Sequence, residues 1–165
     1  GKFRGPISLR EALAQSINVP AVKVLYLAGI ADSIKTAKNL GIESLKDPSQ
    51  YNLTLVLGGG EVSPLDLTSA YGGFASEGIH HTTQKIIRVA DASGAILESF
   101  EDRNQRAISE NVARTISSIL SDDEARYPSY ARGSPLHFPG YDVAVKTGTT
   151  NDYRDAWGLA IHPIW

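Results

Sequence analysis

The sequence of 165 residues contains no cysteine and no methionine. The absence of cysteine excludes disulfide bonds, thiolate metal sites and a cysteine nucleophile within this chain. No apolar run approaches the ~20 residues that a bilayer-spanning helix needs. The formal net charge is only −2, so bulk electrostatics do not favour a nucleic-acid partner.

The composition, 42% hydrophobic and 21% charged, is typical of a globular domain. A chain of 165 residues is long enough for one domain with a sizeable core. It begins without methionine at Gly1-Lys2-Phe3, and it ends at Trp165, in or just after a predicted strand. We therefore expect residues 1–165 to be a single partial domain that is truncated at both ends.

Capping residues and apolar spacing predict several helices. Ser8 and Glu11 form a capping-box pattern, and the helix that follows is expected to end near residues 16–18, because Pro20 disfavours helical geometry in Val19. Further helices are predicted over residues 20–28, 32–39 and 64–76, and after the cap Ser109.

Antiparallel strands are predicted later in the chain. Residues 83–90 and 95–100 alternate as strands and are joined by the turn sequence Asp-Ala-Ser-Gly, which is typical of a hairpin. Residues 141–149 and 156–162 are predicted to form two more strands, and the proline-containing stretch 122–140 is expected to be a loop. The sequence therefore predicts an α+β domain in which helices pack on an antiparallel sheet.

The end of the strand 141–149 carries a group of residues suited to binding a peptide. Lys146, Thr147 and Thr149 offer a cation and two hydroxyl groups, and Gly148 has no side chain to keep another backbone away. Such an edge suits an extended peptide that ends in a carboxylate. The structural alternative is a solvated lysine at a strand end, followed by an ordinary turn.

Ser16 and Asn18 lie two residues apart near a predicted helix end. A serine hydroxyl can relay a proton, and an asparagine amide can both donate to and accept from a peptide group. Both residue types are also common helix caps, so this pair by itself carries little specificity.

The two groups together match motifs of serine acyl-transfer enzymes. Ser16-Ile17-Asn18 matches S-x-N, and Lys146-Thr147-Gly148 matches K-T-G, in the order those enzymes have them. The stretches LREALAQSINVPAVKVL, LGGGEVSPLDLTSAYGGFASEG and VAVKTGTTNDYRDAW resemble the transpeptidase domain of class A (bifunctional) penicillin-binding proteins. The resemblance covers nearly the whole chain and implies the fold shared by penicillin-binding proteins and serine β-lactamases.

The resemblance implies a peptidoglycan D,D-transpeptidase, which cross-links D-Ala-D-Ala stem peptides and is acylated by β-lactams. It places Ser16, Asn18 and Lys146 in the catalytic machinery. Thr147, Gly148 and Thr149 would bind the substrate, and the Thr149 N–H would form half of the oxyanion hole. No cofactor or metal is implied, and we expect none.

One family motif is absent from this chain. No serine is followed three residues later by lysine, so the S-x-x-K sequence that carries the nucleophile does not occur here. In the family this motif precedes S-x-N, so we expect the nucleophile upstream of Gly1 and an inactive chain when it is alone.

The implied partners are stem peptides, β-lactams and the rest of the same polypeptide, which is expected to supply a glycosyltransferase domain and a membrane anchor on the extracytoplasmic face of the bacterial membrane. Nucleic acid is not an expected partner. Two alternatives are a non-catalytic β-lactam-sensing or cell-wall-binding homologue and a serine β-lactamase. The β-lactamase is the weaker one, because Ile17 stands where its S-D-N motif has aspartate.

Overall fold

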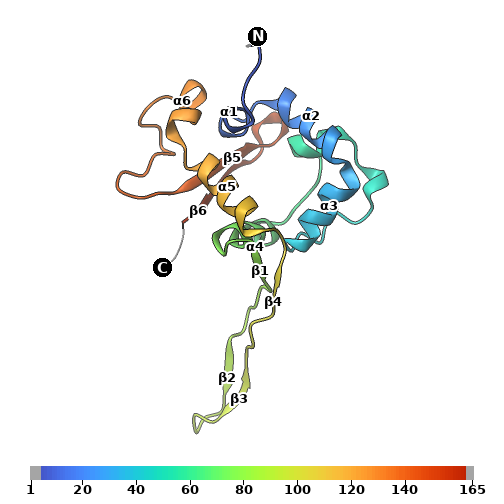
Figure 1. Cartoon of the computed structure of the whole chain (residues 1–165). Helices are drawn as coiled ribbons and strands as arrows, with labels where there is room; N and C mark the ends of the chain where they lie inside the picture. The colour runs from blue at the N-terminus through green and yellow to red at the C-terminus, as the bar shows by residue number, and fades with distance from the viewer. Residues whose placement is uncertain (1–4, 163–165) are drawn as a thin grey trace.

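The computed structural model describes residues 5–162, which form helices gathered around a strand pair and one projecting hairpin (Figure 1). The α-helices are α1 (Leu9–Ala14), α2 (Asn18–Ala28), α3 (Ile30–Asn39), α4 (Pro64–Ala75), α5 (Glu110–Leu120) and α6 (Asp123–Tyr130). Short 3₁₀ turns are η1 (Pro48–Gln50), η2 (Leu53–Leu57) and η3 (Asn151–Tyr153). The strands are β1 (Ile79–His81), β2 (Arg88–Ala90), β3 (Ile96–Ser99), β4 (Asn104–Arg106), β5 (Ala144–Thr149) and β6 (Ala156–Ile161).

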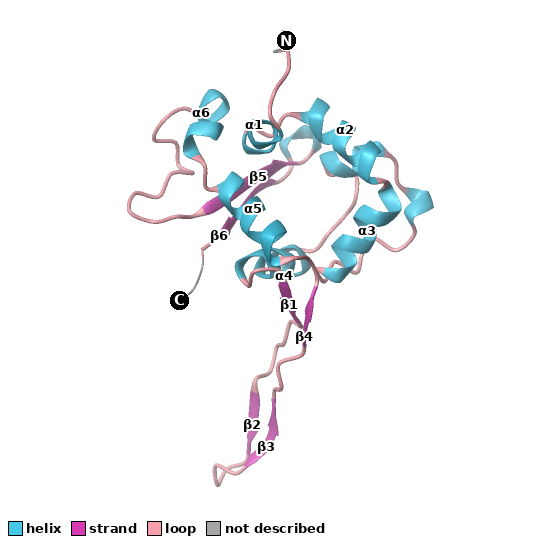
Figure 2. Ribbon diagram, in the orientation of Figure 1, coloured by secondary structure: helices cyan, strands magenta, loops and turns pink. Residues whose placement is uncertain are grey.

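The strand pair β5–β6 is the centre of one apolar core. The two strands are antiparallel, with Lys146 opposite Leu159 and Gly148 opposite Trp157. Buried side chains of α5, β5 and β6 meet there, and residues of α1 and α4 pack around them. Helices therefore cover this sheet, as the predicted α+β architecture requires (Figure 2).

A second core lies among α3, α4 and the segment between them. Its buried members are Ile34, Leu40, Ile42, Leu45 and Ala70. Phe74 of α4 packs against both this cluster and the one at β5–β6. Helix α4 thus joins the two cores.

No helix within residues 5–162 is long and apolar enough to cross a bilayer.

The predicted hairpin is present and extends away from the helices (Figure 1). Its strands, β2 and β3, are shorter than the predicted ranges 83–90 and 95–100. At its base a second pair forms, β1 with β4, which the sequence analysis did not predict because each strand has only three residues. His80 and His81 lie in β1, where they bond to Ser69 and Asp102 respectively.

Most helix boundaries follow the capping residues. Ser8 and Glu11 form the complete capping box, and Ser63 and Ser109 cap α4 and α5. The prediction that α2 starts at Pro20 was wrong, because the helix begins at Asn18. Pro20 still falls in the first turn, where backbone N–H groups have no partner within the helix.

The prediction of a loop over residues 122–140 was also wrong, because α6 forms within it. Asp122 caps this helix by accepting the Ala125 N–H at 2.9 Å, although Pro128 lies inside it. Short helices depend on tertiary contacts more than on propensity, and Arg126 supplies these contacts from a side chain that is 3% exposed. It donates hydrogen bonds to the carbonyls of Leu120 and Leu136.

Gly78, between α4 and β1, is expected to tolerate alanine poorly. Its φ is +92°, and an added Cβ would lie 2.4 Å from the Ile108 carbonyl oxygen. Gly94 in the hairpin turn is a matched control, because its φ is +87° but no atom lies within 4 Å of the added Cβ. Gly94→Ala should lower the free energy of unfolding by about 1 kcal/mol, the penalty of the left-handed conformation alone. Gly78→Ala should lower it by about 2 kcal/mol more, because the backbone must also shift.

Urea unfolding of the two variants measures this difference. Equal losses of stability in Gly78→Ala and Gly94→Ala would contradict the close approach of Gly78 to Ile108.

Candidate active site

Ser16 lies at the sharp break between α1 and α2. Its φ is +56°, a left-handed conformation that residues other than glycine rarely adopt. Strained backbone of this kind is characteristic of functional sites. The break turns the chain so that the half-buried Ser16 side chain can reach the strand β5.

Lys146 of β5 joins the two sequence motifs. Its Nζ donates a hydrogen bond to Ser16 Oγ at 2.5 Å, although the two residues are 130 positions apart. A second hydrogen bond, of 2.7 Å, runs from Nζ to the Thr147 carbonyl oxygen. Bonds from a charged donor are short and strong, so this ammonium holds the α1–α2 break against the strand.

Tyr130, at the C-terminal end of α6, also belongs to this group. Its hydroxyl lies 2.7 Å from Thr147 Oγ1 and 3.4 Å from Ser16 Oγ. The sequence analysis missed it because residues 122–140 were predicted to be a loop. No short motif marks this tyrosine, and only the formation of α6 brings it to the two motifs.

Burial and charge alter the titration of the two central groups. Burial lowers the pKa of Lys146 below its ordinary value, and the neighbouring Tyr130 partly opposes this effect. For Tyr130, burial raises the pKa, but hydrogen bonds with Ser16 and Thr147 and the charges of Lys146 and Arg126 outweigh it, so its pKa is lowered. The site therefore places a lysine that loses its proton more easily than usual beside a tyrosine that also loses its proton more easily than usual.

The remaining predicted residues lie beside this group but make fewer contacts. Asn18 is exposed at the first position of α2, and its side chain makes no hydrogen bond within residues 5–162. Thr147 is half-buried, whereas Gly148 and Thr149 are exposed toward the end of β5. The structure thus brings Ser16, Lys146 and Thr147 together and leaves the other three predicted residues open to solvent.

Gly148 is not required by the fold around it. Its φ is not in the left-handed region, and an added Cβ would meet Trp157 Cβ at 3.5 Å, an ordinary contact. Neither backbone conformation nor the described neighbours demand glycine there. A residue without a side chain at this position lets a second backbone approach the strand more closely than other residue types would.

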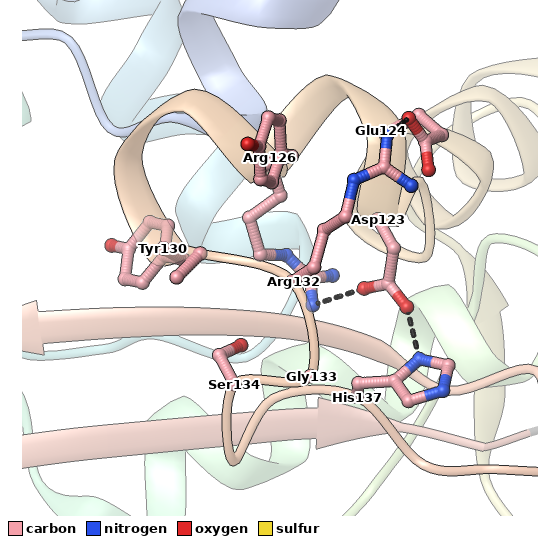
Figure 3. Close-up of a pocket in the computed structure, with 10 residues that line it drawn as sticks. Asp123, Glu124, Arg126, Tyr130, Arg132, Gly133, Ser134 and His137 are labelled. Carbon is pink, nitrogen blue, oxygen red and sulfur yellow. Dashed lines mark hydrogen bonds and ion pairs between the residues drawn. The ribbon is translucent and has the colours of Figure 1, made fainter.

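A cavity of about 260 Å³ adjoins this group and is lined by α6 and the loop that follows it (Figure 3). Asp123 bridges Arg126 and His137 within it, and Tyr130 lies at its opposite end. The bond between Asp123 and His137 links α6 to the loop that follows it. No group of three or more His, Cys, Asp or Glu side chains suited to a metal ion occurs among residues 5–162.

Tyr153 and Trp157 follow the K-T-G strand. Trp157 is half-buried in β6, whereas Tyr153 is 89% exposed. Its φ of +56° and that of Asp152, +57°, turn the chain sharply after β5 and direct this segment outward.

Solved structures share this fold. The PonA1 protein from Mycobacterium tuberculosis in complex with penicillin V superposes with a TM-score of 0.79 at 24% identity, over 99% of this chain and 46% of that one. The imipenem acyl-enzyme complex of penicillin-binding protein A from M. tuberculosis gives a TM-score of 0.77 at 23% identity, over 95% and 39%. At these identities the likeness establishes the fold alone.

Sequence comparison identifies the family. Penicillin-binding protein 1A of Aquifex aeolicus is 34% identical over 170 residues, which are 98% of this chain and 21% of that protein. Penicillin-binding protein 1A of Neisseria meningitidis serogroup A is 30% identical over 168 residues, which are 99% and 20%. The chain therefore spans about a fifth of the length of these relatives. Residues 1–158 match the family described as the penicillin-binding protein transpeptidase domain, and the chain belongs to that family.

Proposed function

We propose that this chain is the part of a peptidoglycan D,D-transpeptidase that carries the S-x-N and K-T-G motifs. The observation that carries the proposal is the 2.5 Å hydrogen bond from Lys146 Nζ to Ser16 Oγ. It joins the two motifs in one group next to an exposed strand end that suits a peptide. Family membership and the shared fold support the same assignment.

In the proposed reaction, a serine of an S-x-x-K motif outside this chain attacks the amide between two D-alanines of a stem peptide. The C–N bond breaks, D-alanine leaves with a proton on its amine, and the acyl group stays on the serine. An amine of a second stem peptide then displaces the serine and forms the cross-link. Two steps of this kind replace one difficult step.

Ser16 would deliver the proton to the leaving amine. Its hydroxyl receives a hydrogen bond from the Lys146 ammonium, so a proton given to the substrate can be replaced from Nζ. The lowered pKa of Lys146, caused mainly by burial, makes this transfer easier than from an ordinary lysine. Before this transfer, the positive charge of the Lys146 ammonium attracts the anionic end of the substrate.

The end of β5 would hold the substrate. The hydroxyls of Thr147 and Thr149 would bind its carboxylate, and the bare Gly148 lets its backbone lie close to the strand. The N–H of Thr149 would donate to the developing oxyanion, a contact typically worth about 3 kcal/mol of barrier. The exposed amide of Asn18, without a partner within residues 5–162, would bind a peptide group of the substrate.

The whole enzyme would act on the extracytoplasmic face of the bacterial membrane, where peptidoglycan is assembled. Its partners would be stem peptides, β-lactams and further segments of the same polypeptide that supply the nucleophile, a glycosyltransferase domain and a membrane anchor.

Acylation by a penicillin tests the proposal directly. The chain alone and the full-length product of its gene are each incubated with a penicillin and analysed by intact mass spectrometry. We expect one covalent adduct on the full-length product and none on the chain, because no S-x-x-K occurs in it. A folded full-length product without an adduct would overturn the enzyme and leave a non-catalytic homologue. An adduct on the chain alone would place the nucleophile within it.

Ser16→Ala in the full-length product should slow penicillin acylation by about 10²- to 10⁴-fold, the usual contribution of a positioned proton donor. Ser129→Ala is the matched control, because Ser129 is exposed on α6 and makes no hydrogen bond within residues 5–162. Stopped-flow measurement of the second-order acylation rate constant distinguishes the two. Equal rates in both variants would remove Ser16 from the mechanism.

Lys146→Met should change how stability depends on pH. Because burial lowers the pKa of Lys146 below the ordinary 10.5, the folded state disfavours the ammonium. This destabilisation is complete below the folded-state pKa and disappears as the pH rises through it toward 10.5. The unaltered protein should therefore gain stability relative to Lys146→Met as the pH rises from neutral toward 10.5 in urea unfolding.

Lys35→Met, at an exposed position of α3, serves as the control and should show no such relative change. Parallel pH profiles for the unaltered protein and Lys146→Met would argue against a buried charge at this position.

A further inference from the structure

The hydroxyl of Tyr130 occupies a position between the two motifs that the proposed mechanism leaves unassigned. It lies 2.7 Å from Thr147 Oγ1, in the K-T-G strand, and 3.4 Å from Ser16 Oγ, in the S-x-N turn. The first distance is that of a good hydroxyl–hydroxyl hydrogen bond, and the second is at the outer limit. The stronger hydrogen bond of the Tyr130 hydroxyl is therefore the one with Thr147 Oγ1.

Which of the two hydroxyl groups donates in this hydrogen bond determines whether Thr147 can also donate to a ligand. A tyrosine hydroxyl and a threonine hydroxyl each carry one proton, so only one of them donates in the bond between them. If Tyr130 donates to Thr147 Oγ1, the Thr147 proton is free to point elsewhere. If Thr147 donates instead, its proton is used within the protein and a ligand finds no donor there.

A carboxylate ligand selects between these two arrangements. It can only accept hydrogen bonds, so it binds the arrangement in which Thr147 donates outward and Tyr130 donates to Thr147. Hydrogen bonds arranged in such a chain polarise one another, which strengthens the last donor in the chain. The nearby Lys146 ammonium attracts the same anion, so charge and donor direction favour one ligand class.

The surroundings hold Tyr130 in this place. Arg126, one turn earlier in α6, is 2% exposed and donates to the carbonyl oxygens of Leu120 and Leu136, which fixes the helix to the end of α5 and to the following loop. Directly after Tyr130, Ala131 has a φ of +50°, strained for a residue with a side chain. This strained C-terminal end of α6 directly follows a tyrosine whose hydroxyl is directed at Thr147.

We propose that Tyr130 is a positioning residue that sets the preference for anionic ligands, by donating to Thr147 Oγ1 and directing the Thr147 proton toward a carboxylate. The proposal rests on the function assigned above. It adds a residue of α6 to a site otherwise built from the S-x-N and K-T-G motifs.

The test is a double-mutant cycle in the full-length product of the gene. Tyr130→Phe, Thr147→Val and the double variant are compared with the unaltered protein by the second-order rate constant of acylation by a penicillin, whose carboxylate is the probe. We expect Tyr130→Phe to slow acylation about tenfold, through weaker binding before the chemical step. In the Thr147→Val background the same change should have less than about twofold effect, because its target hydroxyl is gone.

Tyr127→Phe is the matched control. Tyr127 lies one turn before Tyr130, its ring is 4.7 Å from the Arg132 guanidinium, and its hydroxyl makes no hydrogen bond within residues 5–162. Its loss should leave the rate constant unchanged. Melting temperatures of all variants identify any loss of folding.

Each outcome decides between the two proposals. Equal rates for Tyr130→Phe and the unaltered protein would overturn the role of Tyr130 alone, and so would an effect of the same size with and without the Thr147 hydroxyl. A folded, unaltered protein that is not acylated would overturn the proposed function, and the role of Tyr130 with it.

Discussion

The site depends on the hydrogen bond that the half-buried Lys146 ammonium donates to Ser16 Oγ. The ammonium donates to Ser16 Oγ and also to the Thr147 carbonyl, and so links the break between the first two helices to a strand near the other end of the described chain. An unpaired charge is more costly in a partly desolvated place than one that donates to two oxygen acceptors. The positions of the two motifs are therefore coupled, because moving either one would break the bond from the ammonium to Ser16 Oγ.

The scaffold around this contact explains how strain is tolerated. Ser16 and Ala131 both have a positive φ. Ser16 lies at the break between α1 and α2, and Ala131 directly follows Tyr130 at the end of α6. Leu13 of α1 packs on the apolar cluster at β5–β6, and the hydrogen bonds of Arg126 hold α6. Strain at a site persists only where the surrounding structure determines the backbone, and these contacts do so on the two sides of the site.

A buried arginine does comparable work for α6. Arg126 bonds to carbonyl oxygens at the end of α5 and in the loop after α6, and Asp123 balances its charge. Losing any one partner would leave a buried charge incompletely satisfied, so the helix is confined to one orientation. That orientation places the Tyr130 hydroxyl against the K-T-G strand, and Tyr130 also lines one end of the cavity in Figure 3.

Local sequence determined the parts of this protein that depend on neighbouring residues. Ser8, Ser63 and Ser109 each bond within three residues, so their helix starts could be predicted, as could the hairpin around Gly94 and the two strands β5 and β6. The motifs also identified Ser16 and Lys146 as candidates, because residue type and order carry that information.

Only the tertiary structure decided which side chains meet. The contact between Lys146 and Ser16 spans 130 residues, and the helix that carries Tyr130 forms despite Pro128, through bonds of Arg126 to segments outside it. Long-range contacts of this kind depend on how the whole chain packs, and no local spacing records them.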